Sequence, residues 1–257
     1  MSTPVVFDGA TIQLLRAGSG EPLLFLHPAG GAGQWRPYHS LLAEHFDVIA
    51  PDGPGFGGSD AIEAIDGIDD LVYFNLDLLD RLGLERPYVV GASFGGWLAA
   101  ELAVHSPHRV GRLVLVDAIG LDLPDHPYAD LFAMTREETI AALFHDQAVG
   151  EKVFPPDPDI DALVQDYKDK TAFANVAWSP FMCDPKLERR LRRITAPTLV
   201  IWGAGDRVVP VAHGERYAES IPDATLAVLP DCGHAALVEK TEPAVTAIVE
   251  FLRGGES

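Results

Sequence analysis

One serine in this sequence lies where its hydroxyl can act as a nucleophile. Residues 91–95 read Gly-Ala-Ser-Phe-Gly and fit the pattern G-x-S-x-G, with Ser93 at the centre. In that pattern the serine sits on a sharp turn between a strand and a helix, and small flanking residues let the backbone turn so tightly. The apolar residues 88–90 predict the strand, and the Ala- and Leu-rich residues 97–103 predict the helix. The alternative interpretation is a glycine-rich turn whose serine merely faces solvent.

Two further residues supply the groups that a serine nucleophile needs. An alcohol is a poor nucleophile at neutral pH, so a base within hydrogen-bond reach must take its proton. His234 suits that role, because a histidine titrates near neutral pH and can return the proton later. Asp206 suits the third role, in which a carboxylate fixes the imidazole tautomer and stabilises the imidazolium. Asp117 is a second candidate for the acid, because it also ends a predicted strand.

The elements that must position these residues form a regular series of strands and helices. Short apolar runs, as expected for strands buried on both faces, alternate with segments that carry apolar residues at helical spacing. This alternation predicts an α/β fold with a mostly parallel, doubly wound sheet of about eight strands. Ligands bind at the carboxyl ends of the strands in such sheets, which is where the four candidate residues stand. The predicted strands are residues 5–7, 11–16, 23–26, 46–50, 88–90, 113–117, 198–202 and 225–229, with further helices over 35–45, 68–82, from 211 and over 242–252.

The alternation breaks between residues 119 and 193, where no strand-like run appears. Helices are predicted there over residues 135–144, which open on a capping box, over 159–173 and over 185–193. Many prolines separate these helices, so the segment is predicted to be helical and irregular.

We expect residues 120–186 to form a helical cap over the sheet edge, and residues 1–119 and 187–257 to form an α/β core domain. Interfaces of this kind favour ligand binding, so the aromatic residues Trp178 and Phe181 are candidates for the pocket wall. A basic cluster near the end of the insertion is interpreted as a solvated helix face, with an anion site as the alternative; it comprises Lys186, Arg189, Arg190, Arg192 and Arg193.

Bulk composition excludes several classes of protein. The chain has 257 residues and a formal net charge of -19, which argues against non-specific binding to nucleic acid. No apolar run approaches the length of a membrane span, and the first residues do not resemble a signal peptide. Cys183 and Cys232 lack metal-ligand spacing and predict reduced thiols in a cytoplasmic protein. We expect a small-molecule substrate, neither metal nor cofactor, and either a monomer or a homodimer.

The order serine, acid, histidine along the chain resembles that of the α/β-hydrolases. The resemblance covers essentially the whole chain and is that of a capped serine hydrolase of the esterase or carbon–carbon hydrolase type. Its motifs are LHPAGG at 26–31, DGPGFGGS at 52–59, GASFGG at 91–96, WGAGDRVVP at 202–210 and GH at 233–234.

The resemblance assigns further roles. It implies that the backbone N–H groups of Ala29 and Phe94 form an oxyanion hole, and it favours Asp206 over Asp117 as the acid. Pro28 departs from the family pattern, which usually has glycine there, so the placement of the Ala29 donor is left open. Ala235 departs from the pattern of carbon–carbon hydrolases of meta-cleavage products, which usually carry tryptophan after the histidine.

We therefore expect a serine hydrolase that cleaves a small, largely apolar carboxylic ester through an acyl-enzyme. A carbon–carbon bond hydrolase or a perhydrolase-like enzyme is the alternative, and a non-catalytic ligand receptor on the same fold is the alternative from another class. The serine nucleophile does not fit the haloalkane dehalogenase and epoxide hydrolase branches, which use aspartate. His27, Trp178, Phe181 and Val208 are the pocket candidates, although hydrogen bonds between loops are the leading interpretation for His27. The histidines at 105, 108, 126, 145 and 213 are interpreted as surface residues.

Overall fold

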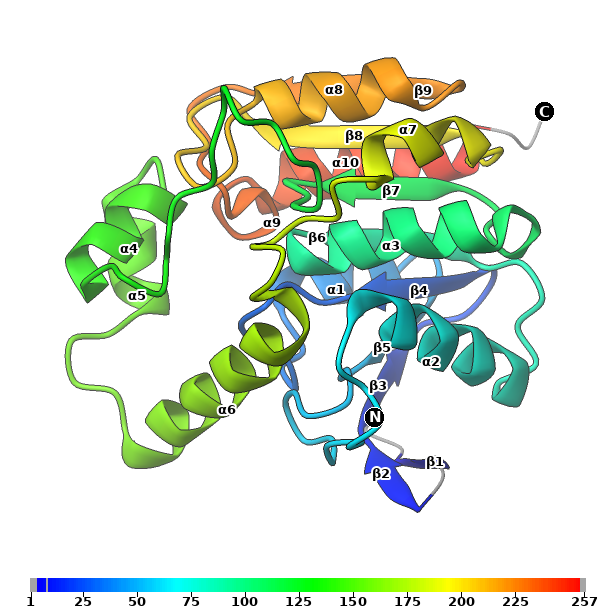
Figure 1. Ribbon diagram of the computed structural model, residues 1–257, viewed down its shortest axis with the longest axis horizontal. Helices are drawn as coiled ribbons and strands as arrows, with labels where there is room; N and C mark the ends of the chain where they lie inside the picture. The colour runs from blue at the N-terminus through cyan, green and yellow to red at the C-terminus, as the bar shows by residue number, and fades with distance from the viewer. Residues whose placement is uncertain (1–3, 8, 255–257) are drawn as a thin grey trace.

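The computed structural model describes residues 4–7 and 9–254, and a central sheet of seven strands organises them (Figure 1). The strand order is β3-β5-β4-β6-β7-β8-β9, and every neighbouring pair is parallel except β3 with β5. The predicted mostly parallel α/β sheet is therefore confirmed. The strands are β3 (Leu14–Ala17), β4 (Pro22–Leu26), β5 (Asp47–Pro51), β6 (Tyr88–Ala92), β7 (Leu113–Val116), β8 (Thr198–Gly203) and β9 (Ala224–Leu229).

A separate pair of strands accounts for the difference from the predicted N-terminal strands. β1 (Val5–Phe7) and β2 (Ala10–Ile12) form their own antiparallel hairpin. The predicted strand 11–16 is divided at Gln13 into β2 and β3. The division has a physical reason: the Gln13 N–H donates to Ser59 Oγ at 2.9 Å, and its carbonyl accepts from the Asp52 N–H at 2.9 Å. Gln13 therefore bonds to the loop after β5 instead of to a neighbouring strand.

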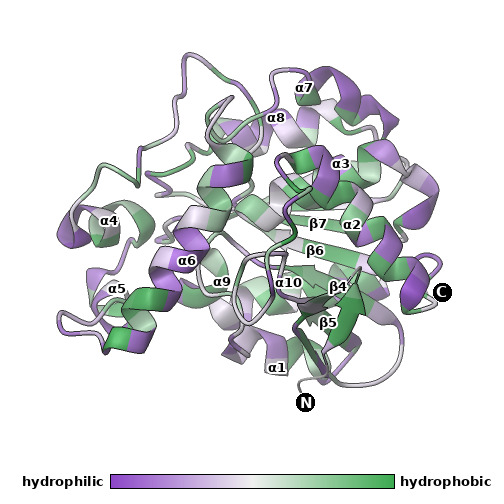
Figure 2. Ribbon diagram, turned by 60° about the horizontal axis from the view of Figure 1, so that its bottom comes forward, coloured by the Kyte–Doolittle hydropathy of each residue, from purple (hydrophilic) through white to green (hydrophobic). Residues whose placement is uncertain are grey.

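Helices cover both faces of the sheet, as a doubly wound fold requires (Figure 1). Two large buried clusters, one on each face, form the core. In Figure 2 the apolar strands β4 to β7 lie inside, behind helices whose outer faces are hydrophilic. α2 (Ile68–Arg81), α3 (Phe94–His105) and α8 (Ala212–Ser220) pack on one face, and α1 (Pro37–Ala43), α9 (Ala236–Glu239) and α10 (Thr241–Arg253) pack on the other.

The segment between β7 and β8 is helical, as predicted. It contains α4 (Arg136–Leu143), α5 (Gln147–Val153) and α6 (Ile160–Ala177), followed by α7 (Leu187–Arg190). Figure 1 shows α4, α5 and α6 at one end of the sheet, apart from the helices that cover its faces. The Thr135 hydroxyl accepts from the Glu138 N–H, and Glu138 in turn accepts from the Thr135 N–H, so the predicted capping box is confirmed.

α5 was not predicted. Its seven residues contain Gly150 and carry no apolar stripe of helical period, so tertiary packing has to stabilise it. A Cβ at Gly150 would lie 2.5 Å from Ile140 Cγ2 and 2.8 Å from Phe144 Cδ2. The glycine therefore lets α5 pack closely on α4, which the local sequence pattern does not reveal. No helix in the described ranges is long and apolar enough to cross a lipid bilayer.

Candidate active site

Ser93 lies on a strained turn between β6 and α3. Its backbone angles, φ 51° and ψ -112°, place it in a region that residues with a side chain rarely adopt. The turn is possible because the residues two positions before and after Ser93 are glycines. A Cβ at Gly91 would lie 2.2 Å from the Gly95 carbonyl oxygen, and one at Gly95 would lie 2.1 Å from that of Leu26. The glycines of the motif are thus required by close backbone approach.

The structure brings Ser93, His234 and Asp206 together. Ser93 Oγ lies 2.9 Å from His234 Nε2, and His234 Nδ1 lies 2.8 Å from Asp206 Oδ2. The carboxylate can only accept, so Nδ1 carries the proton and Nε2 is left to accept from the serine hydroxyl. His234 and Asp206 are buried, and Ser93 is partly exposed. This arrangement can pass a proton from the serine to the imidazole.

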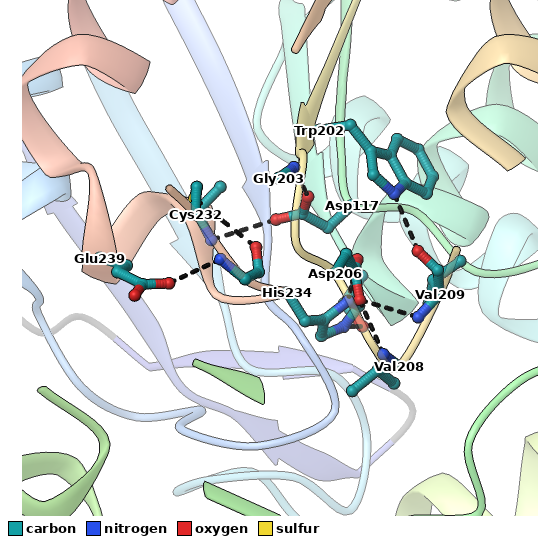
Figure 3. A network of polar contacts seen from close by, with 12 residues as sticks. Asp117, Trp202, Gly203, Asp206, Val208, Val209, Cys232, His234 and Glu239 are labelled. Carbon is teal, nitrogen blue, oxygen red and sulfur yellow. Dashed lines mark hydrogen bonds and ion pairs between the residues drawn. The ribbon is translucent and has the colours of Figure 1, made fainter. Parts of the chain in front are cut away.

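The loop after β8 fixes the orientation of the Asp206 carboxylate. Asp206 Oδ1 accepts from the N–H groups of Val208 and Val209, both at 2.8 Å (Figure 3). Its other oxygen is then directed at His234. The carboxylate therefore accepts three hydrogen bonds, and together they fix the orientation of its plane.

Asp117 lies close by but binds backbone amides instead of the imidazole. Its Oδ1 accepts from the Gly203 N–H at 2.9 Å, and its Oδ2 accepts from the Ala236 N–H at 3.1 Å (Figure 3). Asp117 itself has φ 46°, again a rare conformation for a residue with a side chain. The contacts join the end of β8 to the start of α9. In this geometry Asp117 is a structural cross-link, and Asp206 is the carboxylate next to His234.

Charges around His234 control its protonation. Burial lowers the pKa of His234, but the Asp206 charge and its hydrogen bond outweigh that effect and raise the pKa above the ordinary value of 6.5. Burial raises the pKa of Asp117 well above its ordinary value of 3.8, and the nearby charge of Asp206 raises it further.

Phe94 and Ala29, the two predicted oxyanion donors, follow the carboxyl ends of the neighbouring strands β6 and β4. Phe94 is the first residue of α3, so its N–H belongs to the unpaired first turn of that helix. Ala29 follows β4, directly beside the strand that carries Ser93. Within the described residues, neither N–H donates to a protein acceptor. Both donors remain available for a negatively charged oxygen.

His27 connects two loops. Its Nδ1 donates to the Pro28 carbonyl at 2.7 Å, and its Nε2 accepts from the Gly53 N–H at 3.0 Å. Both ring nitrogens are therefore occupied, which leaves no free position for a catalytic base. The interpretation of His27 as a residue that holds loops together agrees with these contacts. Its ring also lines a small, mainly apolar cavity together with Phe56, Phe94 and Asn75.

The three other pocket candidates lie in different surroundings. Val208 is buried in the core, 1% exposed, and its role at the site is the N–H that binds Asp206. Trp178 is 59% exposed on the outside of the insertion, and Phe181 is half-buried beside it. Phe173, which the sequence did not single out, lies nearest to the site: its ring centroid is 5.1 Å from that of Phe94. Of Trp178, Phe181 and Phe173, Phe173 is the one in ring contact with the residue that follows Ser93.

The structure corrects the interpretation of one histidine and adds one glutamate that the sequence analysis missed. His213 is fully buried and not on the surface, because it lies on the inner face of α8, where its Nε2 donates to the His126 carbonyl at 2.7 Å. Glu239 was missed altogether, although it bonds to the loop that carries His234. Its only signal in the sequence is its position five residues after the histidine, which by itself predicts nothing.

The described residues contain no group of three or more His, Cys, Asp or Glu side chains arranged to hold a metal ion. Cys183 and Cys232 are free and buried, and burial raises the pKa of Cys183 to about 11 and that of Cys232 to about 12. Neither thiol is therefore activated as a nucleophile at neutral pH.

Known proteins resemble this chain over most of its length. Residues 23–247 match the model of the family described as the Alpha/beta hydrolase family. The chain is 32% identical over 270 residues to 2-hydroxy-6-oxo-6-phenylhexa-2,4-dienoate hydrolase of Burkholderia cepacia, with 95% of this chain and 92% of that protein covered. It is 33% identical over 254 residues to 2-hydroxy-6-oxononadienedioate/2-hydroxy-6-oxononatrienedioate hydrolase 2 of Pseudomonas putida, with 91% and 88% covered. A solved meta-cleavage product hydrolase superposes with a TM-score of 0.82 at 25% identity and covers 98% of each chain.

Proposed function

The chain belongs to the alpha/beta hydrolase family, and on that premise we propose that it is a serine hydrolase with Ser93 as the nucleophile, His234 as the base and Asp206 as the acid. The observation that carries the proposal is the continuous pair of hydrogen bonds from Ser93 through His234 to Asp206, at 2.9 and 2.8 Å. A hydroxyl that only faced solvent would not need a buried imidazole and a buried carboxylate behind it.

The reaction follows from what each group can do. His234 takes the proton of Ser93 as Oγ forms a bond to the substrate's carbonyl carbon. The carbonyl oxygen becomes negative and accepts from the N–H groups of Phe94 and Ala29, each worth roughly 3 kcal/mol of transition-state stabilisation. The imidazolium then gives its proton to the departing group, and an acyl-serine remains. Water, deprotonated by His234, releases the acid and restores the hydroxyl.

For the bond that is cleaved, we propose the carbon–carbon bond next to a ketone in a 2-hydroxy-6-oxo-dienoate. The curated relatives described above are hydrolases of such compounds and match more than nine-tenths of this chain. The same groups serve this substrate, because the proton from His234 then goes to the departing carbon atom in place of an oxygen. Of the two relatives' substrates, we favour the phenyl compound, since Phe173 contacts Phe94 and continues into an aromatic cluster with Phe132 and Phe181.

A direct comparison of substrates tests the proposal. Purified protein would be given the phenyl dienoate, the dienedioate and p-nitrophenyl butyrate, with Ser93→Ala as the control for each. We expect the highest kcat/KM for the phenyl dienoate, with benzoate and a five-carbon dienoate as products, and loss of turnover in Ser93→Ala. Turnover of none of the three would favour the ligand receptor instead.

Hydrolysis of a small apolar carboxylic ester is the second candidate. The observation that favours it is Ala235, which stands where carbon–carbon hydrolases of this type usually carry tryptophan. An alanine there leaves more room next to His234 and removes one aromatic wall. A higher kcat/KM for p-nitrophenyl butyrate than for the phenyl dienoate would support ester hydrolysis as the function.

We also propose that residues 120–186 act as a cap, which restricts the substrate without supplying the triad. Several contacts that join this segment to the core support the proposal. The Gly57 N–H donates to Asp169 Oδ1 at 2.9 Å, and Lys168 Nζ donates to the Gly57 carbonyl at 2.8 Å. Asp169→Ala removes contacts between α6 and the core. It should therefore change the ratio of kcat/KM between large and small substrates, while the kcat for the smallest substrate changes less.

A further inference from the structure

The loop that carries His234 lies between two other segments. This histidine loop, residues 231–235, bonds on one side to the loop after β8, where the Gly205 N–H donates to the Cys232 carbonyl at 2.8 Å. On the other side it bonds to the turn between α4 and α5, residues 143–146, which we call the insertion turn. There the Ala235 N–H donates to the Leu143 carbonyl at 3.2 Å. The position of His234 therefore depends on the insertion as well as on the sheet.

Glu239, on α9, joins the histidine loop to the insertion turn. Its carboxylate accepts from the Gly233 N–H at 2.7 Å and from the His145 N–H at 3.1 Å, and it also accepts from the Asp146 N–H. Figure 3 shows Glu239 on the side of the histidine loop opposite to Asp117. One side chain thus satisfies three backbone donors from two segments that are about ninety residues apart in the sequence.

The two segments are in direct backbone contact at this point. A Cβ at Gly233 would lie 2.4 Å from the Leu143 carbonyl oxygen and 2.9 Å from Phe144 Cα. Because the neighbours are backbone atoms, they have no side-chain freedom with which to make room. A movement of the insertion turn must therefore move Gly233, the residue next to His234.

Nothing in the reaction itself uses Glu239. Within the described residues it makes no hydrogen bond to Ser93, His234 or Asp206, and the hydrogen bonds it does make are to backbone amide groups. A carboxylate is well suited to three N–H donors, because hydrogen bonds to a charged acceptor are roughly twice as strong as neutral ones. Glutamine keeps the length of the side chain but has one acceptor oxygen and directs an NH₂ group at the remaining donors.

We propose that Glu239 is a positioning residue: it holds the insertion turn and the histidine loop as one unit and so keeps His234 aligned with Ser93 and Asp206. This rests on the proposed function for its effect on turnover, whereas the mechanical coupling does not depend on it. The pKa of His234 is raised by the charge of Asp206 and by the hydrogen bond to it, so a displaced histidine loop also displaces the pH profile.

Two measurements on the full chain test the proposal, with Glu239→Gln and Glu239→Ala as variants. Glu242→Gln is the matched control, because Glu242 is an exposed carboxylate three residues further on. Amide hydrogen exchange followed by mass spectrometry should show that residues 143–146 and 232–235 lose protection together in both Glu239 variants. Steady-state kinetics should show kcat lowered on the order of 10- to 100-fold, as expected for a misplaced catalytic group, with a smaller change in KM.

The pH profile separates positioning from general support of the fold. In Glu239→Gln the acid limb of kcat/KM should move to lower pH, because a displaced His234 interacts less with the charge of Asp206 and with its hydrogen bond, which together raise the pKa of His234. A lower melting temperature with wild-type kcat and an unchanged acid limb would overturn the proposal. Loss of protection in only one of the two segments would overturn it too. Full activity in Ser93→Ala would refute the proposed function instead, and would leave the exchange result to decide the coupling.

Discussion

The two buried aspartates near His234 differ in what they bind. Asp206 bonds to the imidazole, whereas Asp117 bonds to the N–H groups of Gly203 and Ala236. Both residues follow strands at the same edge of the sheet, so the sequence leaves both as candidates, and the family resemblance favours Asp206. The hydrogen bonds provide the physical reason for that preference.

Substitution of each aspartate by asparagine distinguishes their roles. In Asp206→Asn the amide group stabilises the wrong tautomer of His234, so kcat should fall by about ten-thousandfold without loss of the fold. In Asp117→Asn one of the two hydrogen bonds from backbone N–H groups is weakened, and kcat should fall far less. Steady-state kinetics and circular dichroism of both variants provide the measurement. A larger loss of kcat in Asp117→Asn would assign the acid to the end of β7.

The pH dependence should reflect the raised pKa of His234. A protonated imidazole cannot accept the Ser93 proton, so kcat/KM should fall as the pH falls, with an acid limb above 6.5. The raised pKa of His234 also contributes to the stability of the fold, with the opposite pH dependence. This contribution is fully present below pH 6.5 and is lost as the pH rises through the folded-state pKa. In Asp206→Asn the acid limb should move to lower pH. A wild-type limb below 6.5 would contradict this electrostatic account of the site.

At the scale of elements, hydrophobic periodicity and turn residues were sufficient to predict most strands of the sheet. The buried strands are runs of apolar residues, and the Ser93 turn has its glycines where backbone atoms would meet a Cβ. α5 and α9 could not be predicted, because each is short and is stabilised by contacts with distant segments. Gly150 and Glu239 show the reason: their roles depend on neighbours that are remote in the sequence or belong to another helix.

α3 contains a buried carboxylate that affects stability. Glu101 is fully buried; Trp97 Nε1 donates to its Oε1 at 3.2 Å, and its Oε2 accepts no hydrogen bond from the described residues. Burial is the largest of several effects that together raise the pKa of Glu101 from 4.5 to about 7. The folded state therefore holds a proton that the unfolded chain releases, and stability falls as the pH rises from 4.5 towards 7.

Glu101→Gln should stabilise the protein at high pH. Glutamine retains an acceptor for the Trp97 N–H and removes the cost of burying a charge. The gain in unfolding free energy should be small near pH 5 and reach at most about 3 kcal/mol above pH 7, from the linkage of pKa to stability. Urea unfolding at several pH values measures it, with Glu242→Gln as the control. A gain that is independent of pH would show that the charge is not the cause.

At the scale of the whole molecule, aromatic side chains connect the site to the surface of the insertion. The ring of Phe94 contacts Phe173 on α6, the ring of Phe173 stacks on Phe132 at 5.8 Å, and Phe132 contacts Trp178. Exposure increases along this series, from 2% at Phe94 to 59% at Trp178. The sequence predicted aromatic residues for the pocket wall, but it could not show which of them contacts Phe94.

That order makes a prediction about specificity. Phe173→Leu should lower kcat/KM for substrates with a large apolar acyl group by about tenfold, since part of a buried apolar contact is lost. Acetate esters should be affected much less. Trp178→Ala, the matched change at the exposed end of the series, should have little effect on either. Kinetics with acetate, butyrate and octanoate esters would test this, and equal effects of the two substitutions would contradict it.

The central claim is that Ser93 is the nucleophile, activated by His234, and one measurement tests it most directly. Wild-type protein and Ser93→Ala would be treated with a fluorophosphonate probe, and the labelled peptide and the kcat of each would be determined. We predict one adduct, on Ser93, in the wild type, no adduct in the variant, and a kcat lowered by about a millionfold, as when a triad nucleophile is removed. Labelling at another residue together with full activity in Ser93→Ala would contradict the account.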